Sequence, residues 1–337
     1  MIDLRSDTVT TPSPAMREAV LDAPVADDKR DGDPTVAEVE AAVADRLGMN
    51  AGLFCPTGTM ANQVAIAVHT DHGQEILHDR WAHVYTSEFA GPARLSGLQS
   101  RPIDAGPRGC PTPAGITAAL DERTQWPGAG LLTLENTHNK RGGAAISGDA
   151  IDAAAEAARA EGLAVHLDGA RLGNAAVARD CEMADFTGAV DSATLCLSKG
   201  LGAPIGTVLT GDPDFIERAR NYRHAFGGGL RQAGIAAAPG LLAIENVARL
   251  AEDHENAAVL AERLTAETPL DVSDPETNIL ICDVAAAGLD SDRFQTRCAE
   301  RDVRVSTIDS SRVRLVTHLD VDRDDIETAA DRIADAV

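Results

Sequence analysis

Lysine is almost absent from this chain of 337 residues, because only three of its 30 basic residues are lysines: Lys29, Lys140 and Lys199. Arginine keeps its proton, whereas a lysine removed from water can lose its proton and attack a carbonyl carbon. Lys29 lies among other charged residues and Lys140 in a turn-like sequence. Lys199 follows an apolar run, so it is the strongest candidate for amine chemistry. The alternative is an ordinary lysine at the end of a strand.

Membrane spans, targeting signals and paired cysteines are also missing. No apolar run approaches the length of a membrane span, and residues 1–5 have no signal-peptide character, which favours a cytoplasmic protein without a membrane partner. The six cysteines show no C-x-x-C spacing, which argues for reduced thiols and against a zinc site or a disulfide framework. We therefore expect no metal site.

Positive charge is scarce as well, because 53 acidic residues give a formal net charge of −23. Nucleic-acid binding needs a basic surface, so we expect no nucleic-acid partner. The acidity has two explanations that remain open. It could serve general solubility, or it could reflect adaptation to high salt, where ions screen the repulsion between surface carboxylates. The second explanation predicts a halophilic protein.

The order of apolar patterns predicts an α/β fold with two domains behind an N-terminal arm. Strand and helix patterns alternate between residues 52 and 212, which is typical of a mostly parallel sheet flanked by helices. The pattern changes towards the C-terminus, where we expect a small α+β domain. The expected divisions are an arm at 1–14, a large α/β domain at 15–245 and a small domain at 246–337.

Individual elements follow from the same patterns. Asp33 and Pro34 predict the start of a helix that continues to about residue 47, and Pro239 predicts a kink or break in a helix over 231–266. The other expected strands are 52–55, 131–134, 164–167, 193–197, 278–282, 303–305 and 313–316, and the other expected helices are 60–69, 213–226, 291–301 and 323–337.

A carboxylate precedes the candidate lysine by 31 positions, since Asp168 ends a short apolar run and is followed by Gly169. This interval holds a helix or loop and one more strand, so neighbouring parallel strands would present Asp168 and Lys199 at one sheet edge, where ligands of such sheets bind. Pyridoxal phosphate requires a lysine for its aldehyde and an acid for its ring nitrogen. Asp168 could instead be a simple turn former.

An anion site is predicted between the strand that ends at Cys55 and the following helix. Gly58 and Thr59 stand at this junction, where free N–H groups of a helix N-terminus and a hydroxyl would face an anion. The motif is neither a P-loop nor Gly-x-Gly-x-x-Gly, and a plain strand-to-helix turn is the alternative. Together with Asp168 and Lys199 it predicts a cup for the phosphate of the same cofactor.

With these motifs the chain resembles the low-specificity L-threonine aldolases, which are pyridoxal-phosphate enzymes of the aspartate-aminotransferase fold type. The matching stretches run in family order over nearly the whole chain: 1–10, 56–59, 134–139, 168–171, 197–202, 227–232 and 313–320. The resemblance implies cleavage of β-hydroxy-α-amino acids, such as L-threonine or L-allo-threonine, to glycine and an aldehyde such as acetaldehyde. It also implies a homodimer or homotetramer with shared active sites. Another reaction on this fold, β-elimination or transamination, remains the alternative.

The resemblance also implies roles for individual residues. Lys199, His83 and Asp168 would be catalytic, with His83 stacked on the cofactor ring. The further cofactor-binding residues would be Gly58, Thr59, Arg171, Ser198 and, from a neighbouring subunit, Arg231. The substrate would be bound by Ser6, Glu88, Arg171 and Arg314.

Several positions leave alternatives open. Arg312 competes with Arg314 because it would share the same strand face. His138 and Asn139 would either line the site or belong to a turn. Arg30 stands where the family usually has a tyrosine that lines the active site, and the stretch 124–130 lacks a histidine found in many relatives. We therefore expect an altered substrate preference or turnover, with His83 or water accepting the hydroxyl proton.

Overall fold

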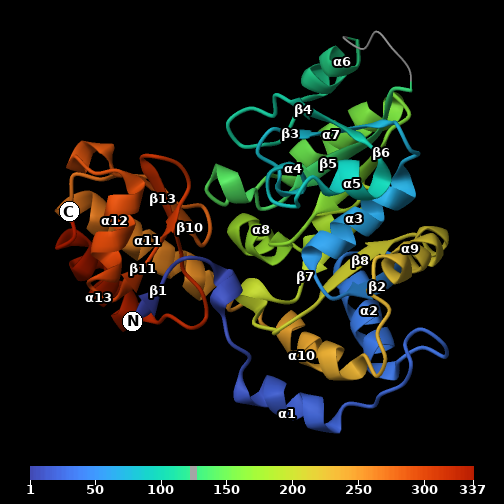
Figure 1. Ribbon diagram of the computed structural model, residues 1–337, viewed down its shortest axis with the longest axis horizontal. Helices are drawn as coiled ribbons and strands as arrows, with labels where there is room; N and C mark the ends of the chain where they lie inside the picture. The colour runs from blue at the N-terminus through green and yellow to red at the C-terminus, as the bar shows by residue number, and fades with distance from the viewer. Residues whose placement is uncertain (122–126) are drawn as a thin grey trace.

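The computed structural model describes residues 1–121 and 127–337 (Figure 1). Its largest element is a seven-stranded sheet of order β2-β8-β7-β6-β5-β3-β4. All neighbouring strands are parallel except at β8, which is antiparallel to both β2 and β7. The mostly parallel sheet is therefore confirmed. Its strands are β2 (Ala51–Cys55), β3 (Glu75–Asp79), β4 (Gln99–Ile103), β5 (Ala129–Glu135), β6 (Ala164–Asp168), β7 (Ser192–Cys196) and β8 (Thr207–Gly211).

Helices cover both faces of this sheet (Figure 1). On one face α3 packs across the sheet beside α9, and on the other face α2 and α7 bury their apolar sides in the main core. The helices of this part are α1 (Pro14–Asp22), α2 (Pro34–Arg46), α3 (Gly58–His69), α4 (His83–Thr86), α5 (Gly91–Ser96), α6 (Pro113–Asp121), α7 (Gly148–Ala160), α8 (Leu172–Arg179), α9 (Pro213–Ala225) and α10 (Gly234–Ile244). The 3-10 turns are Asp7–Val9, Asn139–Arg141, Met183–Phe186 and Lys199–Leu201.

The start of α2 shows how local sequence sets these elements. The side chain of Asp33 accepts hydrogen bonds from the N–H groups of Thr35 and Val36, and Pro34 occupies the first helical position. A proline is tolerated there because the first N–H groups of a helix have no partner inside the helix. The predicted helix start is confirmed.

A second sheet lies beside the first in the C-terminal part, with strand order β12-β13-β10-β9. It packs with α11, α12 and α13 around a separate apolar core. These elements are β9 (Asp271–Val272), β10 (Ile279–Asp283), β12 (Ser306–Thr307), β13 (Arg312–Val316), α11 (Leu250–Glu267), α12 (Ser291–Ala299), α13 (Arg323–Ala334) and a 3-10 turn at Ala285–Ala287. Among the described residues, no helix is both long and apolar enough to cross a membrane.

The N-terminal arm joins the C-terminal core. Its strand β1 (Ile2–Asp3) pairs in parallel with β11 (Val303–Arg304), and Ile2 and Leu4 are buried in the C-terminal core (Figure 1). The arm then crosses to the large sheet, where the hydroxyl of Thr10 donates to the backbone carbonyl of Lys199. The domain divisions at 14/15 and 245/246 stay a prediction.

One predicted break is wrong. The helix expected over 231–266 is two helices, and Pro239 lies inside α10 rather than between them. Because Pro239 is the sixth residue of α10, its missing N–H removes only one hydrogen bond near the helix start. The chain instead turns at 245–249, between α10 and α11.

Phe294→Ala tests whether the C-terminal core holds the chain together. Phe294 is fully buried there, so the variant should lose about 3–5 kcal/mol of unfolding free energy through lost burial and the cavity left behind. Leu21→Ala is the control, because Leu21 is 82% exposed and its loss should cost less than about 0.5 kcal/mol. Urea unfolding measures both. Equal losses in the two variants would contradict this account of the core.

Candidate active site

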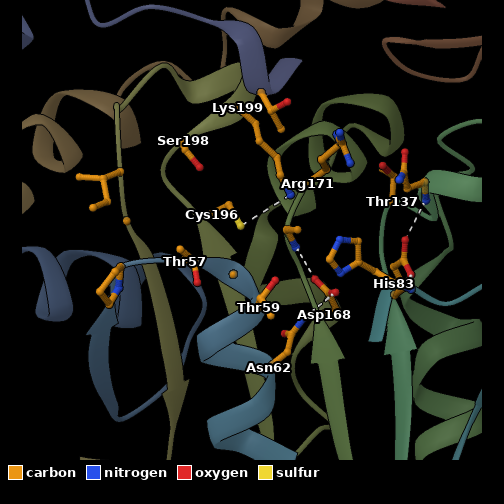
Figure 2. Close-up of a pocket in the computed structure, with 18 of the residues that line it drawn as sticks. Thr57, Thr59, Asn62, His83, Thr137, Asp168, Arg171, Cys196, Ser198 and Lys199 are labelled. Carbon is orange, nitrogen blue, oxygen red and sulfur yellow. Dashed lines mark hydrogen bonds between the residues drawn. The ribbon is translucent and has the colours of Figure 1, made fainter. Parts of the chain in front are cut away.

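A cavity of about 330 Å³ opens where β5, β6 and β7 end and α3 begins (Figure 2). It collects most of the residues predicted for the site. Those that line it are Gly58, Thr59, His83, Asp168, Arg171, Ser198 and Lys199. Thr8, Thr57, Asn62, Glu135, Thr137, Asn139 and Cys196 also line it.

Lys199 enters the cavity from the loop after β7. Its backbone has φ of 65°, a left-handed conformation that costs energy for any residue with a Cβ. Its amine nitrogen Nζ lies 3.8 Å from the sulfur Sγ of Cys196, and its carbonyl accepts from Thr10. The structure therefore places Lys199 at the edge of the sheet, as predicted.

Asp168 ends β6, the strand next to β7, and is 3% exposed. Its Oδ2 accepts from Nδ2 of Asn62 at 2.8 Å, and its Oδ1 accepts from the N–H of Ala170 at 3.1 Å. Burial alone would raise the pKa of Asp168. The charges of His83 and Lys199 and the hydrogen bond from Asn62 outweigh burial and hold this pKa below its usual range.

His83 faces Asp168 across the cavity floor (Figure 2). Its Nδ1 lies 2.8 Å from Oε1 of Glu88, and its backbone N–H donates to Oε2 of Glu135 at 2.7 Å. Burial lowers the pKa of His83, but the Glu88 hydrogen bond and the surrounding carboxylates raise it above its usual value. Glu88 is 3% exposed and lies behind His83 rather than in the cavity lining.

Glu135, at the end of β5, forms hydrogen bonds to two segments that line the cavity. Its Oε2 accepts from the N–H of His83, and its Oε1 accepts from the N–H of Asn139 at 2.9 Å. Asn139 lines the cavity, whereas His138 is buried behind it, 3.0 Å from Asp79. Of the two residues whose place was open, Asn139 therefore lines the site and His138 does not.

The first turn of α3 forms the opposite end of the cavity. Thr57 caps the helix by accepting from the N–H of Met60, while Gly58, Thr59 and Ser198 line the space in front of it. A Cβ at Gly58 would lie 3.1 Å from Sγ of Cys196, so a larger residue would crowd this cradle. Helix N-termini of this kind suit an anion.

Of the two arginines predicted to bind a carboxylate, Arg171 lines the cavity, whereas Arg314 on β13 is outside its lining and contacts the lining residue Asn139. Arg171 is buried, and its Nε and Nη2 donate to the two carboxylate oxygens of Asp7, each at 2.7 Å. Arg314 donates to Asn139 at 2.7 Å and to the carbonyl of Arg5, but it has no carboxylate partner among the described residues. Its Nε is buried without an acceptor. Burial, followed by the charge of Arg171, lowers the pKa of Arg314 to about 10.

Arg314 is therefore suited to a carboxylate ligand, since an unpaired guanidinium gains a partner when one binds. Arg312, the competing candidate, is directed elsewhere, because it forms an exposed ion pair with Asp309 and lines a different cavity. Ser6 caps the turn Asp7–Val9 and is not in the cavity lining.

Two further predicted positions lie outside the cavity of this chain. Arg231 is half exposed and pairs with Asp27 at 3.2 Å. Arg30, at the place of the family tyrosine, is exposed and lies 3.7 Å from the same Asp27. The histidine-free stretch 124–130 falls partly on 122–126, outside the described residues.

The sequence did not single out Asp7, Asn62 or Glu135 as site residues. Asp7 is fully buried against Arg171, and Asn62 lies between Asp168 and Glu88. A signal for Asn62 was present, because it is a polar residue in the apolar run 60–68 and stands one helical turn after Thr59. Asp7 has no such signal, since its partner lies 164 positions away.

The donors in the cavity fit pyridoxal phosphate. An amine at Lys199, a carboxylate at Asp168 and a helix N-terminus at Gly58 line one space, and these are the groups that the aldehyde, ring nitrogen and phosphate require. His83, Glu88 and Asp168 also offer ligand atoms within 4.8 Å of one another. However, Nδ2 of Asn62 already donates to both of these carboxylates, so the absence of a metal site stays a prediction.

The fold and the cavity define the class of fold type I pyridoxal-phosphate enzymes, and comparisons with known proteins agree. The beta-eliminating lyase family matches residues 3–287. A low-specificity L-threonine aldolase of Escherichia coli is 44% identical over 98% of this chain and 97% of its own length. The threonine aldolase structure of Leishmania major has a TM-score of 0.84 at 19% identity, covering 99% of this chain and 98% of that one.

A structure described as SPT with PLP has a TM-score of 0.76 at 18% identity, covering 99% of this chain and 87% of the other. At this identity the likeness shows the fold alone. The matched family and the Escherichia coli relative show more. The chain belongs to the beta-eliminating lyase family and, within it, to the low-specificity L-threonine aldolases.

Asp7→Asn tests the buried pair beside the cavity. The variant leaves the guanidinium of Arg171 buried without a countercharge, so we expect a loss of about 3–5 kcal/mol of unfolding free energy. The matched control is Asp309→Asn in the exposed pair with Arg312, which should lose less than about 1 kcal/mol. Urea unfolding compares the two. A loss in Asp7→Asn no greater than in the control would contradict the role given to this pair.

Proposed function

We propose that the protein uses pyridoxal phosphate to cleave L-threonine, L-allo-threonine and related β-hydroxy-α-amino acids to glycine and an aldehyde such as acetaldehyde. It is accordingly a carbon–carbon lyase. The observation that carries this proposal is that Lys199 and Asp168 line one cavity together with the first turn of α3. The 44% identical relative, named as a low-specificity L-threonine aldolase, supports the substrate class.

Lys199 holds the cofactor through its amine, and Asp168 carries the negative charge that retains a proton on the ring nitrogen. Gly58, Thr59 and Ser198 bind the phosphate through N–H groups and hydroxyls. When bound, the cofactor supplies the electron sink that accepts the electrons of the broken carbon–carbon bond.

Arg314 and Arg171 bind the carboxylate of the substrate. Arg314 has an unpaired Nε, and Nη1 of Arg171 has no hydrogen-bond partner among the described residues. Fixing the carboxylate prevents rotation of the substrate and aligns the bond to be broken with the cofactor ring. Ser6 supports this end through the turn that places Asp7 against Arg171.

His83 receives the proton of the β-hydroxyl, directly or through a water molecule. Glu88 accepts from Nδ1 of His83, so that in the neutral ring the proton is on Nδ1 and Nε2 is free to take a proton. Because Glu88 and its neighbours raise the pKa of His83, the basic form requires a higher pH than for an ordinary histidine. The cleavage rate should therefore rise with pH through this raised pKa.

A second candidate reaction is β-elimination, because the matched family is described as beta-eliminating lyases. The same lysine, acid and carboxylate-binding arginines would serve it. Incubation with L-serine distinguishes the two reactions, since elimination releases pyruvate and ammonia whereas aldol cleavage releases glycine and formaldehyde.

The proposal extends to the assembly and the location of the protein. We propose a cytoplasmic homodimer or homotetramer in which Arg231 reaches the phosphate of a neighbouring subunit. Its support is that the Arg231 side chain is 53% exposed and does not line the cavity of its own chain. Light scattering that gave the mass of one chain would contradict the shared site.

Lys199→Ala tests the proposed reaction. The purified protein with added pyridoxal phosphate should release equimolar glycine and acetaldehyde from L-threonine, and the variant should release neither above background. Lys29→Ala is the matched control, because Lys29 is exposed and outside the cavity, so its rate should stay near that of the wild type. Cofactor binding without glycine release in the wild type would contradict aldol cleavage, and separate assays of L-threonine and L-allo-threonine give the stereochemical preference.

Salt dependence tests the explanation of the net charge. If the charge of −23 reflects a halophilic protein, activity and melting temperature should both rise between low salt and molar KCl, because ions screen the repulsion among carboxylates. Thermal unfolding and initial rates over this range measure the effect. Values that stay level or fall would leave general solubility as the explanation.

A further inference from the structure

A chain of buried polar groups lies beneath the cavity floor. It begins at Asn62 in α3, whose Nδ2 lies 2.8 Å from Oδ2 of Asp168 (Figure 2). The same Nδ2 lies 2.9 Å from Oε1 of Glu88. The amide is 2% exposed, and each carboxylate is 3% exposed. One NH₂ group thus stands between two carboxylates that are both almost entirely buried.

Burial disfavours the charged form of a carboxylate such as Asp168. Hydrogen bonds that are donated to a carboxylate favour its charged form instead. Asn62 donates to both Asp168 and Glu88 at once. This arrangement works only if the NH₂ group, and not the carbonyl oxygen, of the amide faces the two acids.

The other side of the amide shows what fixes this orientation. Oδ1 of Asn62 lies 3.2 Å from Nε2 of His166 and accepts from the hydroxyl of Thr194 at 3.4 Å. Since an amide oxygen can only accept, His166 must carry its proton on Nε2. A reversed amide would direct its oxygen at two carboxylates and its NH₂ at these donors.

The tautomer of His166 determines the next two contacts. With its proton on Nε2, His166 accepts at Nδ1 from the hydroxyl of Ser192 at 2.8 Å. The oxygen of Ser192 then accepts from Nε2 of His69, also at 2.8 Å. Every hydrogen bond in the chain therefore points from His69 towards Asp168.

Burial supports neutral histidines along this path. His166 is fully buried, and burial, assisted by the nearby His69 and opposed by Asp168, lowers its pKa to about 3. Burial lowers the pKa of His69 to about 4. At neutral pH each ring therefore has one donor and one acceptor nitrogen, as the directed chain requires.

We infer that Asn62 is a positioning residue whose NH₂ group holds Asp168 in place and favours its charged form, and that His166, Ser192 and His69 fix the orientation of this amide. The inference deepens the proposed function and rests on it, because Asp168 matters here as the partner of the cofactor ring nitrogen. The groups that face Asp168 are His83 from α4, Lys199 after β7, His166 on β6, Glu135 on β5 and Glu88.

The first test is nuclear magnetic resonance of the cofactor-loaded full chain labelled with ¹⁵N in its histidines. The signals of His166 and His69 are assigned from His166→Gln and His69→Gln. We expect both rings to be neutral near pH 7 with the proton on Nε2. A proton on Nδ1 of His166 would overturn the inference, because the amide of Asn62 could not then face both acids.

The second test compares Asn62→Leu with Gln63→Leu. Leucine has the same branching and number of side-chain heavy atoms as asparagine but donates nothing, so Asp168 loses a donor and its pKa rises. Cofactor affinity should then fall about 10- to 100-fold, the loss expected for one hydrogen bond to a charged group, and the pH titration of the cofactor absorption should shift. Gln63 is the matched control, because its Nε2 donates to Glu88 and not to Asp168.

Gln63→Leu should leave cofactor affinity and the absorption titration as in the wild type. Equal affinity and equal titrations in Asn62→Leu and the wild type would overturn the inference, as would equal losses in both variants. A wild-type chain that bound no pyridoxal phosphate would instead reject the proposed function. The tautomers of His166 and His69 would still decide whether the hydrogen bonds all run from His69 towards Asp168.

Discussion

The site depends on the register of three parallel strands. Glu135 at the end of β5 is paired with Asp168 at the end of β6, and β7 runs parallel on the other side of β6 and leads into the loop of Lys199. Because the carboxyl ends of parallel strands meet at one edge, two carboxylates and an amine from distant parts of the sequence share one cavity. A shift by one residue would direct these side chains to the opposite face of the sheet.

Charge balance then determines which protonation states this edge can hold. Lys199 and His83 counter Asp168, while Asp7 pairs with the buried guanidinium of Arg171. Arg314 has no carboxylate partner within the described residues. The unpaired cation marks the place where a ligand carboxylate would complete the balance, and this links the geometry to an amino-acid substrate.

Much of this arrangement could be predicted from the sequence. The alternation of apolar runs predicted the parallel sheet, and the scarcity of lysine made Lys199 conspicuous. Side-chain contacts between distant segments could not be predicted, because no local pattern encodes them. Asp7 meets Arg171, and the arm pairs with β11, only after the chain has folded. The break assigned to Pro239 failed because a single proline near a helix start removes only one hydrogen bond.

The most direct measurement is to locate the cofactor on the chain. The protein is incubated with pyridoxal phosphate, reduced with borohydride, digested and mapped by mass spectrometry. The account predicts the added mass on the peptide that contains Lys199 and on neither of the peptides with Lys29 or Lys140, the only other lysines. Attachment at either of those residues, or no attachment at all, would contradict the assignment of the cavity as the cofactor site.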